Sequence, residues 1–545
     1  QVMDAFERAI ELTPVLGELG WEERRSFNGL LSITPDSSSI IGESTEVKNL
    51  WLCEAVWVKE GPGAGKLLAE WMTHGRTSMD PHSVDSARHY PIQKGDDYVR
   101  SRCYESAQKI YTPAVHPREP FATSRGMRVS PFYEREVALG GYFMEVAGWE
   151  RAHGYAANEP TLLSKYRDRV PTREAEWDNR HFWEVSNAEQ LALSDGVGMI
   201  NLSHFAIFDV EGADAESLME YLSVAKVGTD TAIGKGVYTH FLDQAGGIRS
   251  DLTIIRLATD CFRVVCGGDT GHRDYIWMRN MSDKRGFANV TFHDRSEQLA
   301  TLGLWGPDAR VTLAKLMDDP ESISNEAFPF ATTKEIVVCG VKVWAFRISY
   351  VGEQGWELYF PFSDGLGIWD ALFDLGVTPV GIETYANSRR LEKSLRLQNA
   401  DLEIEYNLYE AGLARPKVKA ADFHGKEAYV QQRELQTQAA YLCTFELGDT
   451  TDSNGVIRYP VGNWPILDRD TKHVIVDSHG RRSYTTSMAY GPSLGKNIAM
   501  GYLPADKAVE GDVVLIEYFG EHYDATVMKV GYGALLDPTN ERPRS

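Results

Sequence analysis

The spacing of apolar and polar residues changes character along the chain, and the changes divide it into segments. In the first part, short strand-like apolar runs accompany one helix-like run, AGKLLAEWMTHG, whose apolar residues share a face. The next part is rich in proline, arginine and histidine and has few long periodic runs. We therefore predict a segment at residues 1–80 and a middle, linking segment at 81–160.

Strands and helices alternate from residue 161 to 440, where a weak internal repeat occurs. In both VEGADAESLMEYL and LWGPDARVTLAKLM, a strand-like run leads into Gly-x-Asp-Ala and then an amphipathic helix. Asp214 and Asp308 suit the N-cap positions of these helices, and the glycines suit tight turns. The repeat predicts a duplicated α+β core over 161–440.

Short strands dominate the last segment, residues 441–545. The runs VVLIEYF and DATVMKV are rich in β-branched and aromatic residues and are separated by turn residues. This pattern predicts a small all-β barrel at the end of the chain.

Composition narrows the class of protein. A chain of 545 residues is too long for one core, and 43% hydrophobic with 25% charged residues is typical of a globular protein. The formal net charge of -22 argues against nucleic acid as a partner, because phosphate binding needs basic surface.

No apolar run approaches the roughly 18 residues of a membrane span, so we expect no membrane insertion. The N-terminal residues lack the basic front and long apolar stretch of a signal peptide, and no initiator Met precedes them.

The 6 cysteines are scattered and form no Cys-x-x-Cys pair. This pattern is typical of reduced thiols, so we expect a cytoplasmic location, or the mitochondrial matrix in a eukaryote. It contains no zinc signature, and we predict no metal site.

Two glycine-rich strings resemble catalytic motifs only in part. GPGAGK, residues 61–66, lacks the first glycine and the final Ser or Thr of a phosphate-binding loop, so we interpret it as the start of a helix with glycines for close packing. GPSLG, residues 491–495, lacks the strand–turn–helix context of a hydrolase nucleophile. No strand–GxGxxG–helix dinucleotide fingerprint is present in the sequence.

An ordered set of longer strings carries a family resemblance. NLSHFAIFDVEGADAESLMEYL, VYTHFLDQAGGIRSDLTIIRL, LGLWGPDARVTLAKL, SYVGEQGWELYF, SRRLEKSLRLQNADLEIEYNLYEAGL, DFHGKEAY and YGPSLGKNIAMGYLP resemble the tetrahydrofolate-binding aminomethyltransferase fold of the glycine-cleavage T-protein. Upstream, TPDSSSIIGE, LWLCEAVWVKEGPGAGKLLAEW and RGMRVSPFYEREVALGGYFMEVAGWER resemble the flavin-domain end and middle domain of dimethylglycine and sarcosine dehydrogenases. The resemblance implies an α+β, T-protein-like folate-binding fold with duplicated strand–helix units and a C-terminal β-barrel, preceded by the remnant of an FAD-dependent oxidoreductase domain.

In that family the dinucleotide fingerprint and the flavin-linking histidine lie N-terminal to the part that this sequence resembles. The chain is therefore a fragment or processed chain, one subunit of a split enzyme, or a relative without flavin chemistry, and the missing Met favours the first. The cofactor implied is tetrahydrofolate, with FAD only through a missing or partner N-terminal segment.

Glu357 is an unusual acid inside a strand-like run. It alternates with Trp356 and Leu358, so it points to the opposite face of the strand. A buried carboxylate there needs hydrogen-bond donors, and a pterin ring presents two parallel N–H donors. The resemblance places the family's pterin-binding glutamate at this position; the alternative is a solvent-facing glutamate on an edge strand.

Two further site residues follow from the resemblance. Asp251, after the glycine pair in GGIRSDL, is implied to lie beside the N5/N10 edge of folate and to manage the proton when a folate nitrogen attacks a one-carbon unit. Its alternative is a turn aspartate bonded to its own backbone. Tyr350 resembles the family's site tyrosine, with a packed core tyrosine as the alternative.

Arg390 in SRRLEKS matches the family's Arg-Leu-Glu motif, and could pair with a folate carboxylate or support Glu392. Arg389 and Ser394 stand where an apolar residue and a glycine are usual. Tyr238 in VYTHFL is a further candidate for lining the pocket.

The implied function is one-carbon transfer by an enzyme of the folate-dependent aminomethyltransferase or demethylase type. Flavin oxidises an N-methyl amine, and tetrahydrofolate captures the carbon as methylenetetrahydrofolate. The implied partners are a small methylated amine or other methyl donor, a flavin-binding partner subunit or segment docked on residues 1–80, and further copies of the chain in an oligomer. Two alternatives are a flavin-free folate-dependent methyltransferase acting on an N-, O- or S-methyl donor, and a non-catalytic regulatory subunit.

Overall fold

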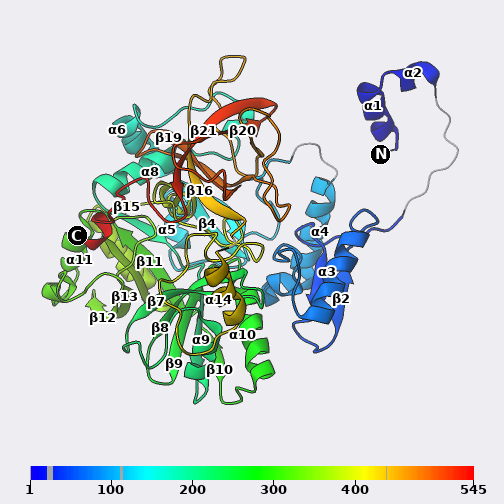
Figure 1. The fold of residues 1–545 in the computed structure, drawn as a ribbon. Coiled ribbons are helices and arrows are strands. Elements are labelled where there is room, and N and C mark those ends of the chain that lie inside the picture. Colours follow the sequence, from blue (N-terminus) through cyan, green and yellow to red (C-terminus); the bar gives the residue numbers. More distant parts are fainter. Residues whose placement is uncertain (1, 21–28, 111–114, 437) are drawn as a thin grey trace. The chain divides into compact units, whose positions relative to one another are not determined.

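The computed structural model describes residues 2–20, 29–110, 115–436 and 438–545, with the backbone alone at 2–6. The chain divides into two units, residues 1–33 and 34–545. The first contains two short helices, α1 (Val2–Leu12) and α2 (Val15–Leu19), and the second contains all the other elements (Figure 1). The predicted boundaries at residues 80, 160 and 440 stay predictions.

The second unit begins with a small two-stranded sheet covered by a helix. Strands β1 (Ile40–Glu43) and β2 (Trp51–Glu54) pair antiparallel, and α3 (Gly61–His74) packs on them through Ala64 and Leu67. The elements that follow are η1 (Ser86–Arg88), η2 (Pro91–Lys94) and α4 (Asp96–Ile110). The strand and helix runs predicted in this segment are therefore present.

The string GPGAGK does begin a helix, as predicted, with a proline in the first turn of α3. The role predicted for its glycines is wrong. A β-carbon placed on Gly61, Gly63 or Gly65 would meet no atom within 4 Å, so none of them permits close packing. The other string, GPSLG, forms the end of β18 and the turn into β19, which excludes a strand–turn–helix nucleophile.

The middle part of the chain consists of short elements around one hairpin. They are α5 (Tyr133–Ala138), β3 (Gly141–Val146), β4 (Trp149–Tyr155), η3 (Ala156–Asn158), η4 (Glu159–Leu163), α6 (Ser164–Tyr166), α7 (Glu176–Asn179) and α8 (Glu184–Asp195). Strands β3 and β4 pair with one another in a separate two-stranded sheet.

A five-stranded antiparallel sheet in the order β10-β6-β9-β8-β7 forms the first half of the core. Its elements are β6 (Ala206–Glu211), α9 (Ala215–Leu222), β7 (Gly236–Leu242), β8 (Ile248–Arg256), β9 (Cys261–Cys266), α10 (Gly271–Arg285) and β10 (Thr291–Asp294). Helices α9 and α10 supply buried side chains to the same apolar cluster as the sheet.

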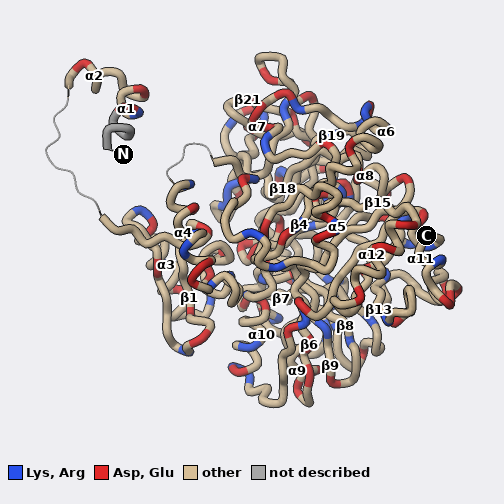
Figure 2. Tube along the Cα trace, turned by 180° about the vertical axis from the view of Figure 1, so that it is seen from behind, with Lys and Arg blue, Asp and Glu red and all other residues tan. Residues whose placement is uncertain are grey.

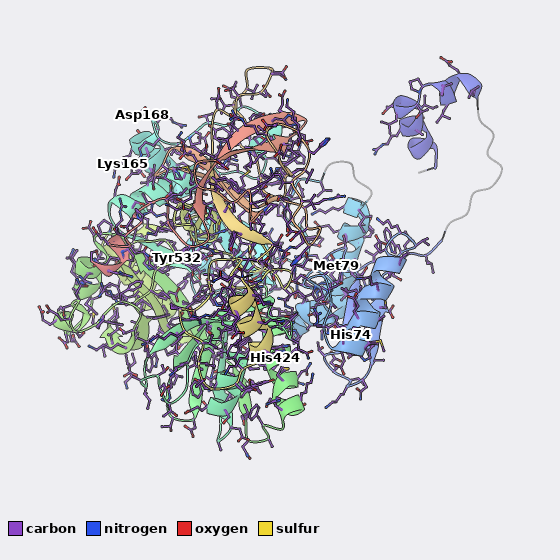
Figure 3. All side chains as sticks on the ribbon, in the orientation of Figure 1. His74, Met79, Lys165, Asp168, His424 and Tyr532 are labelled. Atoms are coloured by element: carbon purple, nitrogen blue, oxygen red, sulfur yellow. The ribbon has the colours of Figure 1, made fainter. Side chains whose placement is uncertain are left out.

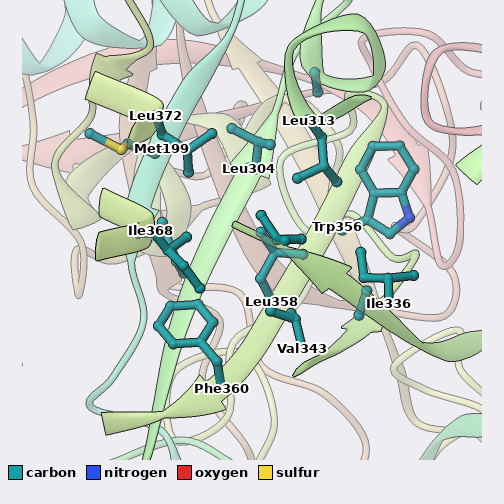
Figure 4. Packing of buried hydrophobic residues seen from close by; sticks show 14 of the residues in the cluster. Met199, Leu304, Leu313, Ile336, Val343, Trp356, Leu358, Phe360, Ile368 and Leu372 are labelled. Atoms are coloured by element: carbon teal, nitrogen blue, oxygen red, sulfur yellow. The ribbon is translucent and has the colours of Figure 1, made fainter. Parts of the chain in front are cut away.

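A six-stranded sheet in the order β12-β13-β14-β11-β5-β15 forms the second half. Its elements are β5 (Gly198–Asn201), β11 (Leu299–Trp305), α11 (Ala309–Ala314), η5 (Pro320–Ile323), β12 (Thr333–Val338), β13 (Val341–Phe346), β14 (Gly355–Pro361), η6 (Phe362–Asp364), α12 (Gly365–Asp374) and β15 (Thr378–Pro379). Figure 4 shows Trp356, Leu358 and Phe360 of β14 packed among side chains of α11 and α12.

The two predicted strand–helix units are β6–α9 and β11–α11, one in each sheet. Gly212 and Gly306 both have positive φ, and a β-carbon on either would lie about 2 Å from a backbone oxygen, so only glycine fits these turns. Asp214 and Asp308 occupy the N-cap positions as predicted, but neither side chain caps its helix. Asp214 instead accepts from the backbone and side chain of Asn289, which lies in the loop between α10 and β10.

The C-terminal segment is a closed six-stranded barrel, as predicted. Its strands are β16 (Ala440–Leu447), β17 (Ile466–Leu467), β18 (Thr485–Gly491), β19 (Lys496–Pro504), β20 (Val513–Tyr518) and β21 (Glu521–Val530), followed by η8 (Arg542–Arg544). In the sheet order β17-β20-β21-β16-β19-β18, strands β17 and β18 are at the two ends. These end strands join because Ile466 N–H donates to Ser483 O at 3.0 Å and Thr485 N–H to Trp464 O at 2.8 Å.

Three helices remain between the second sheet and the barrel. Two are consecutive, namely the π-helical turn η7 (Thr384–Ser388) and α13 (Arg389–Glu392), and α14 (Lys426–Leu435) follows later.

Among the described residues, no helix is both long and apolar enough to cross a membrane, and no group of three His, Cys, Asp or Glu side chains could hold a metal ion. Cys53, Cys261, Cys266, Cys339 and Cys443 are free thiols. Acidic and basic residues are interspersed along the chain (Figure 2).

Ser394 is strained where the resembling family usually has glycine. Its φ is 52° and its buried hydroxyl has no hydrogen-bond partner among the described residues. We expect Ser394→Gly to raise the free energy of unfolding by about 1 kcal/mol, since glycine takes this backbone conformation without strain. Thermal unfolding monitored by circular dichroism measures the change. Ser394→Ala is the matched control, because it removes the hydroxyl but keeps the β-carbon; equal midpoints for the two variants would contradict backbone strain.

Candidate functional site

Glu357 lies inside the second sheet. Strand β14 pairs with β11 and with β13, where Glu357 faces Gly303 and Phe346, so it is not on an edge strand. The side chain is 7% exposed. Its neighbours Trp356 and Leu358 belong to the apolar cluster on the other face, which confirms the predicted alternation (Figure 4). The solvent-facing alternative is excluded.

Two tyrosines donate to the Glu357 carboxylate. Tyr359 Oη lies 2.6 Å from Oε2, and Tyr385 Oη lies 3.3 Å from Oε1. Burial raises the pKa of Glu357 to about 7, although both hydroxyls act in the opposite direction. Each carboxylate oxygen can accept a further hydrogen bond, so the group retains capacity for donors from a ligand.

Aromatic rings lie around Tyr385, one of the two donors to this carboxylate. The ring of Tyr385 lies 4.9 Å from that of Tyr350, 5.7 Å from that of Trp305 and 6.1 Å from that of Phe205, measured between centroids. Tyr385 belongs to the π-helical turn η7, an irregularity that frequently occurs at functional sites. Such walls suit a flat heteroaromatic ring whose edge bonds to an acid.

Asp251 lies within β8 and not in the turn before it. That turn is held by Asp243, whose Oδ1 accepts from the amides of Ala245 and Gly247, both at 2.8 Å. Asp251 Oδ2 accepts from Tyr238 Oη on the adjacent strand β7 at 3.0 Å. His240 Nε2, on the same strand, lies 3.2 Å from that hydroxyl.

The pKa of Asp251 is raised to about 7. Burial is the largest cause, and the negative charges of Asp274 and Asp269 add to it, while the hydrogen bond from Tyr238 acts in the opposite direction. Burial lowers the pKa of His240 to about 3, so this histidine is neutral beside the tyrosine. A carboxyl group with a pKa near 7 can both accept and return a proton at neutral pH.

Tyr238 is partly exposed. Its side chain is 38% exposed, and burial raises the pKa of its hydroxyl well above the usual range. That Tyr238 lines the folate pocket stays a prediction.

Tyr350 lies near both acids. Burial raises the pKa of this tyrosine, and the charge of Asp251 contributes. Its hydroxyl donates to the carbonyl of Arg396, and its ring contacts Tyr385, which bonds to Glu357. Tyr350 is thus within electrostatic range of Asp251 on the first sheet and in ring contact with a tyrosine that binds Glu357 on the second.

Arg390 is not among these groups. It is 2% exposed and donates to Asp401 Oδ2 and to Ser487 Oγ, both at 2.6 Å, and to two backbone carbonyls. The predicted support of Glu392 by Arg390 is wrong, because Arg389 makes that pair, with Nη1 at 2.8 Å from Glu392 Oε2. Since its donors are committed to the protein, we assign Arg390 to the support of the site.

Sequence reasoning missed Tyr359, Tyr385 and His240. The first could have been found, because it is two residues after Glu357 and therefore on the same face of the strand. His240 likewise lies two residues after Tyr238. Tyr385 had no such signal, since it comes from a separate turn.

Three family models match the chain. They are the GCVT N-terminal domain at residues 132–419, the FAD dependent oxidoreductase central domain at 74–130 and the glycine cleavage T-protein C-terminal barrel domain at 462–530. The fold is also that of an aminomethyltransferase T from Bartonella henselae, with a TM-score of 0.59 and 22% identity over 74% of this chain and 97% of that one. The chain belongs to the GCVT N-terminal domain family.

Longer relatives match nearly the whole chain. Human mitochondrial dimethylglycine dehydrogenase is 28% identical over 99% of this chain, and 4-methylaminobutanoate oxidase (formaldehyde-forming) of Paenarthrobacter nicotinovorans is 30% identical over 98%. The chain spans 59% of the first relative and 61% of the second. The resemblance inferred from the sequence strings is therefore confirmed.

Proposed function

We propose that this chain binds tetrahydrofolate and transfers a one-carbon unit to it. The observation that carries the proposal is a pair of carboxyl groups, the buried Glu357 and the partly exposed Asp251, each of which accepts a hydrogen bond from tyrosine and has a pKa raised to about 7. A reduced pterin fits this arrangement: Glu357 supplies a bidentate acceptor, and Tyr350 and Tyr385 supply aromatic faces.

Each residue has a distinct role in this proposal. Tetrahydrofolate supplies, when bound, the nitrogen nucleophiles that accept a one-carbon unit from an electrophilic donor. Glu357 binds and orients the pterin edge, and the surrounding rings exclude water. Tyr238 holds Oδ2 of Asp251. Oδ1 of Asp251 then accepts the proton released at the attacking nitrogen and returns it to the departing amine.

The donor is proposed to be a small N-methylated amine. The two long relatives are named for dimethylglycine and 4-methylaminobutanoate, and both compounds are amines that also carry a carboxylate. We propose that oxidation of the amine takes place on FAD bound by a partner or a further segment. A mitochondrial matrix location in a eukaryote, and association with further copies of the chain, also stay proposals.

The affinity for tetrahydrofolate is expected to fall as the pH falls. The ligand needs the ionised carboxylate, and Glu357 has a pKa of about 7 in the free protein, so a proton must be displaced below that pH. The affinity should be constant above about pH 8 and lower by about tenfold near pH 6. Calorimetric titrations across this range, with the flavin absorbance spectrum recorded on the same sample, test the proposal.

Two variants distinguish the contributions of Glu357 and Asp251 to this pH dependence. Asp251→Asn should keep the pH dependence of binding, because Glu357 is unchanged. Glu357→Gln should bind weakly and without that dependence. The proposed function is wrong if wild-type protein does not bind tetrahydrofolate at any of these pH values.

A further inference from the structure

A second recess lies beside the proposed folate site. Its volume is about 130 Å³, and its walls come from the C-terminal end of α3, from the β7–β8 hairpin and from α10. His424, which also lines it, is labelled in Figure 3 together with His74 and Met79, which flank the lining residues Arg76 and Thr77 in the sequence. The recess is thus formed between α3 and the first sheet with its helix α10.

Arg249 is the unusual group in this recess. Among the described residues its guanidinium makes no hydrogen bond or ion pair, and its Nε is buried without a partner. The group lies over the ring of Trp277, with Cζ 5.1 Å from the ring centroid. Stacking fixes the plane of the guanidinium and leaves its edge N–H groups available to a ligand.

Arg273, on helix α10, is a second arginine that lines the recess. This residue is 3% exposed, and its Nη2 donates to the carbonyl of Arg249 at 3.1 Å and to Asn399 Oδ1 at 3.4 Å. Its Nε has no partner among the described residues, and its Nη1 forms a long ion pair with Asp80 Oδ1 at 3.8 Å. Two guanidinium groups with unused donors therefore share one small space, and burial together with Arg273 lowers the pKa of Arg249.

The acidic residues of the recess do not hydrogen-bond to these guanidinium groups. Asp85 Oδ1 accepts from the amide of Ala87 at 2.9 Å, and Asp243 Oδ1 accepts from amides in its own turn. Glu43 Oε1 accepts from the amide of Asn49 at 2.7 Å. Their attachment to backbone amides leaves room for an anion between the arginines.

The recess is adjacent to the proposed proton acceptor. Arg249 and Asp251 are two residues apart on β8, so their side chains leave the same face of the strand about 7 Å apart. Both are partly exposed, whereas Ser250 between them is fully buried on the other face. Arg249 therefore places the recess about two residues along β8 from Asp251, which is not itself among the lining residues.

We propose that the recess lined by Arg249 and Arg273 binds the carboxylate of the small methylated amine that donates the one-carbon unit. The proposal rests on the proposed function and names the class of its donor, an amine that carries a carboxylate. Arg249 pairs with the two carboxylate oxygens through its free N–H groups, and the Arg273 guanidinium adds a second positive charge. The volume suits a small acid and not a whole folate, since pockets for larger ligands occupy roughly 300–1,000 Å³.

Calorimetry with N,N-dimethylglycine and N,N-dimethylglycinamide, which differ only at the carboxylate, tests this assignment. Wild-type protein should bind the acid at least about tenfold more tightly than the amide, and Arg249→Gln should lose this preference. Arg279→Gln is the matched control, because Arg279 is on the same helix as Arg273 but does not line the recess. Equal binding of acid and amide by the wild type, or no binding of the acid, would overturn the assignment.

The glutamate tail of folate also carries carboxylates. A second titration distinguishes binding of this tail in the recess from binding of the donor. Arg249→Gln should bind tetrahydrofolate and tetrahydropteroate, which lacks the glutamate, as tightly as wild type does. A loss confined to tetrahydrofolate would assign the recess to the glutamate tail and overturn the donor assignment. If wild type binds dimethylglycine through its carboxylate but binds no tetrahydrofolate, the proposed function fails while the carboxylate site stands.

Discussion

Glu357→Ala is expected to lower the affinity for tetrahydrofolate by roughly a hundredfold or more. Two charge-assisted hydrogen bonds to one buried carboxylate are lost, and each such bond contributes on the order of 1.5–3 kcal/mol. The pterin N–H donors would then be buried without acceptors, which adds to the loss. Calorimetric titration at about pH 8, where the wild-type carboxylate is ionised, measures the effect.

Tyr359→Phe is the matched control for this variant. It removes the hydroxyl that donates to Oε2 at 2.6 Å but leaves the carboxylate in place, so tetrahydrofolate should still bind. Without this hydrogen bond the pKa of Glu357 should rise further, and the pH below which affinity falls should rise with it. Thermal unfolding of both variants establishes that they are folded. A folded Glu357→Ala protein that binds within about threefold of wild type would remove Glu357 from the site.

Asp251→Asn is expected to lower the rate of one-carbon transfer by roughly 10²–10⁴-fold, because an amide cannot accept the proton from the attacking nitrogen. Folate affinity should change by less than about threefold, since the pterin anchor is intact. The rate of methylenetetrahydrofolate formation is measured with saturating tetrahydrofolate, with glycine and formaldehyde in equilibrium as the source of the iminium.

The pH profile of the same reaction separates a proton acceptor from a structural aspartate. Bound folate keeps Glu357 ionised, so at saturation the wild-type rate should fall as the pH decreases through about 7, the pKa of Asp251. The variant should show a low rate without that inflection. Tyr238→Phe, which removes only the hydrogen bond to Oδ2, should move the inflection to higher pH and keep most of the rate. An unchanged rate in Asp251→Asn would exclude the proposed role.

The pattern of residues along the sequence was sufficient to predict features that depend on one strand or one turn. The alternation of Trp356, Glu357 and Leu358 predicted which face the acid takes, because side chains of a strand alternate whatever it packs against. The glycines at 212 and 306 likewise identified the repeated turn, since their backbone conformation excludes other residues.

The predictions that were wrong concerned which atoms a residue contacts in the folded chain. The glycines of GPGAGK begin a helix but pack against nothing, and Asp214 bonds to a distant loop and not to its own helix. Arg390 matched a family motif, but the fold surrounds it with internal acceptors. A guanidinium bonds to whichever acceptors the packed chain brings near it, and spacing along the sequence does not specify them.

The sequence by itself determined the duplicated α+β core, the closing barrel and the strand positions of Asp251 and Glu357, because these depend on periodicity and on turn residues that act over a few positions. Only the tertiary structure decided that Tyr238 bonds to Asp251 and Tyr385 to Glu357, and that Arg273 bonds to the carbonyl of Arg249. Such groups come from separate strands and helices, and their proximity and pKa values arise from burial, which exists only once the sheets have packed together.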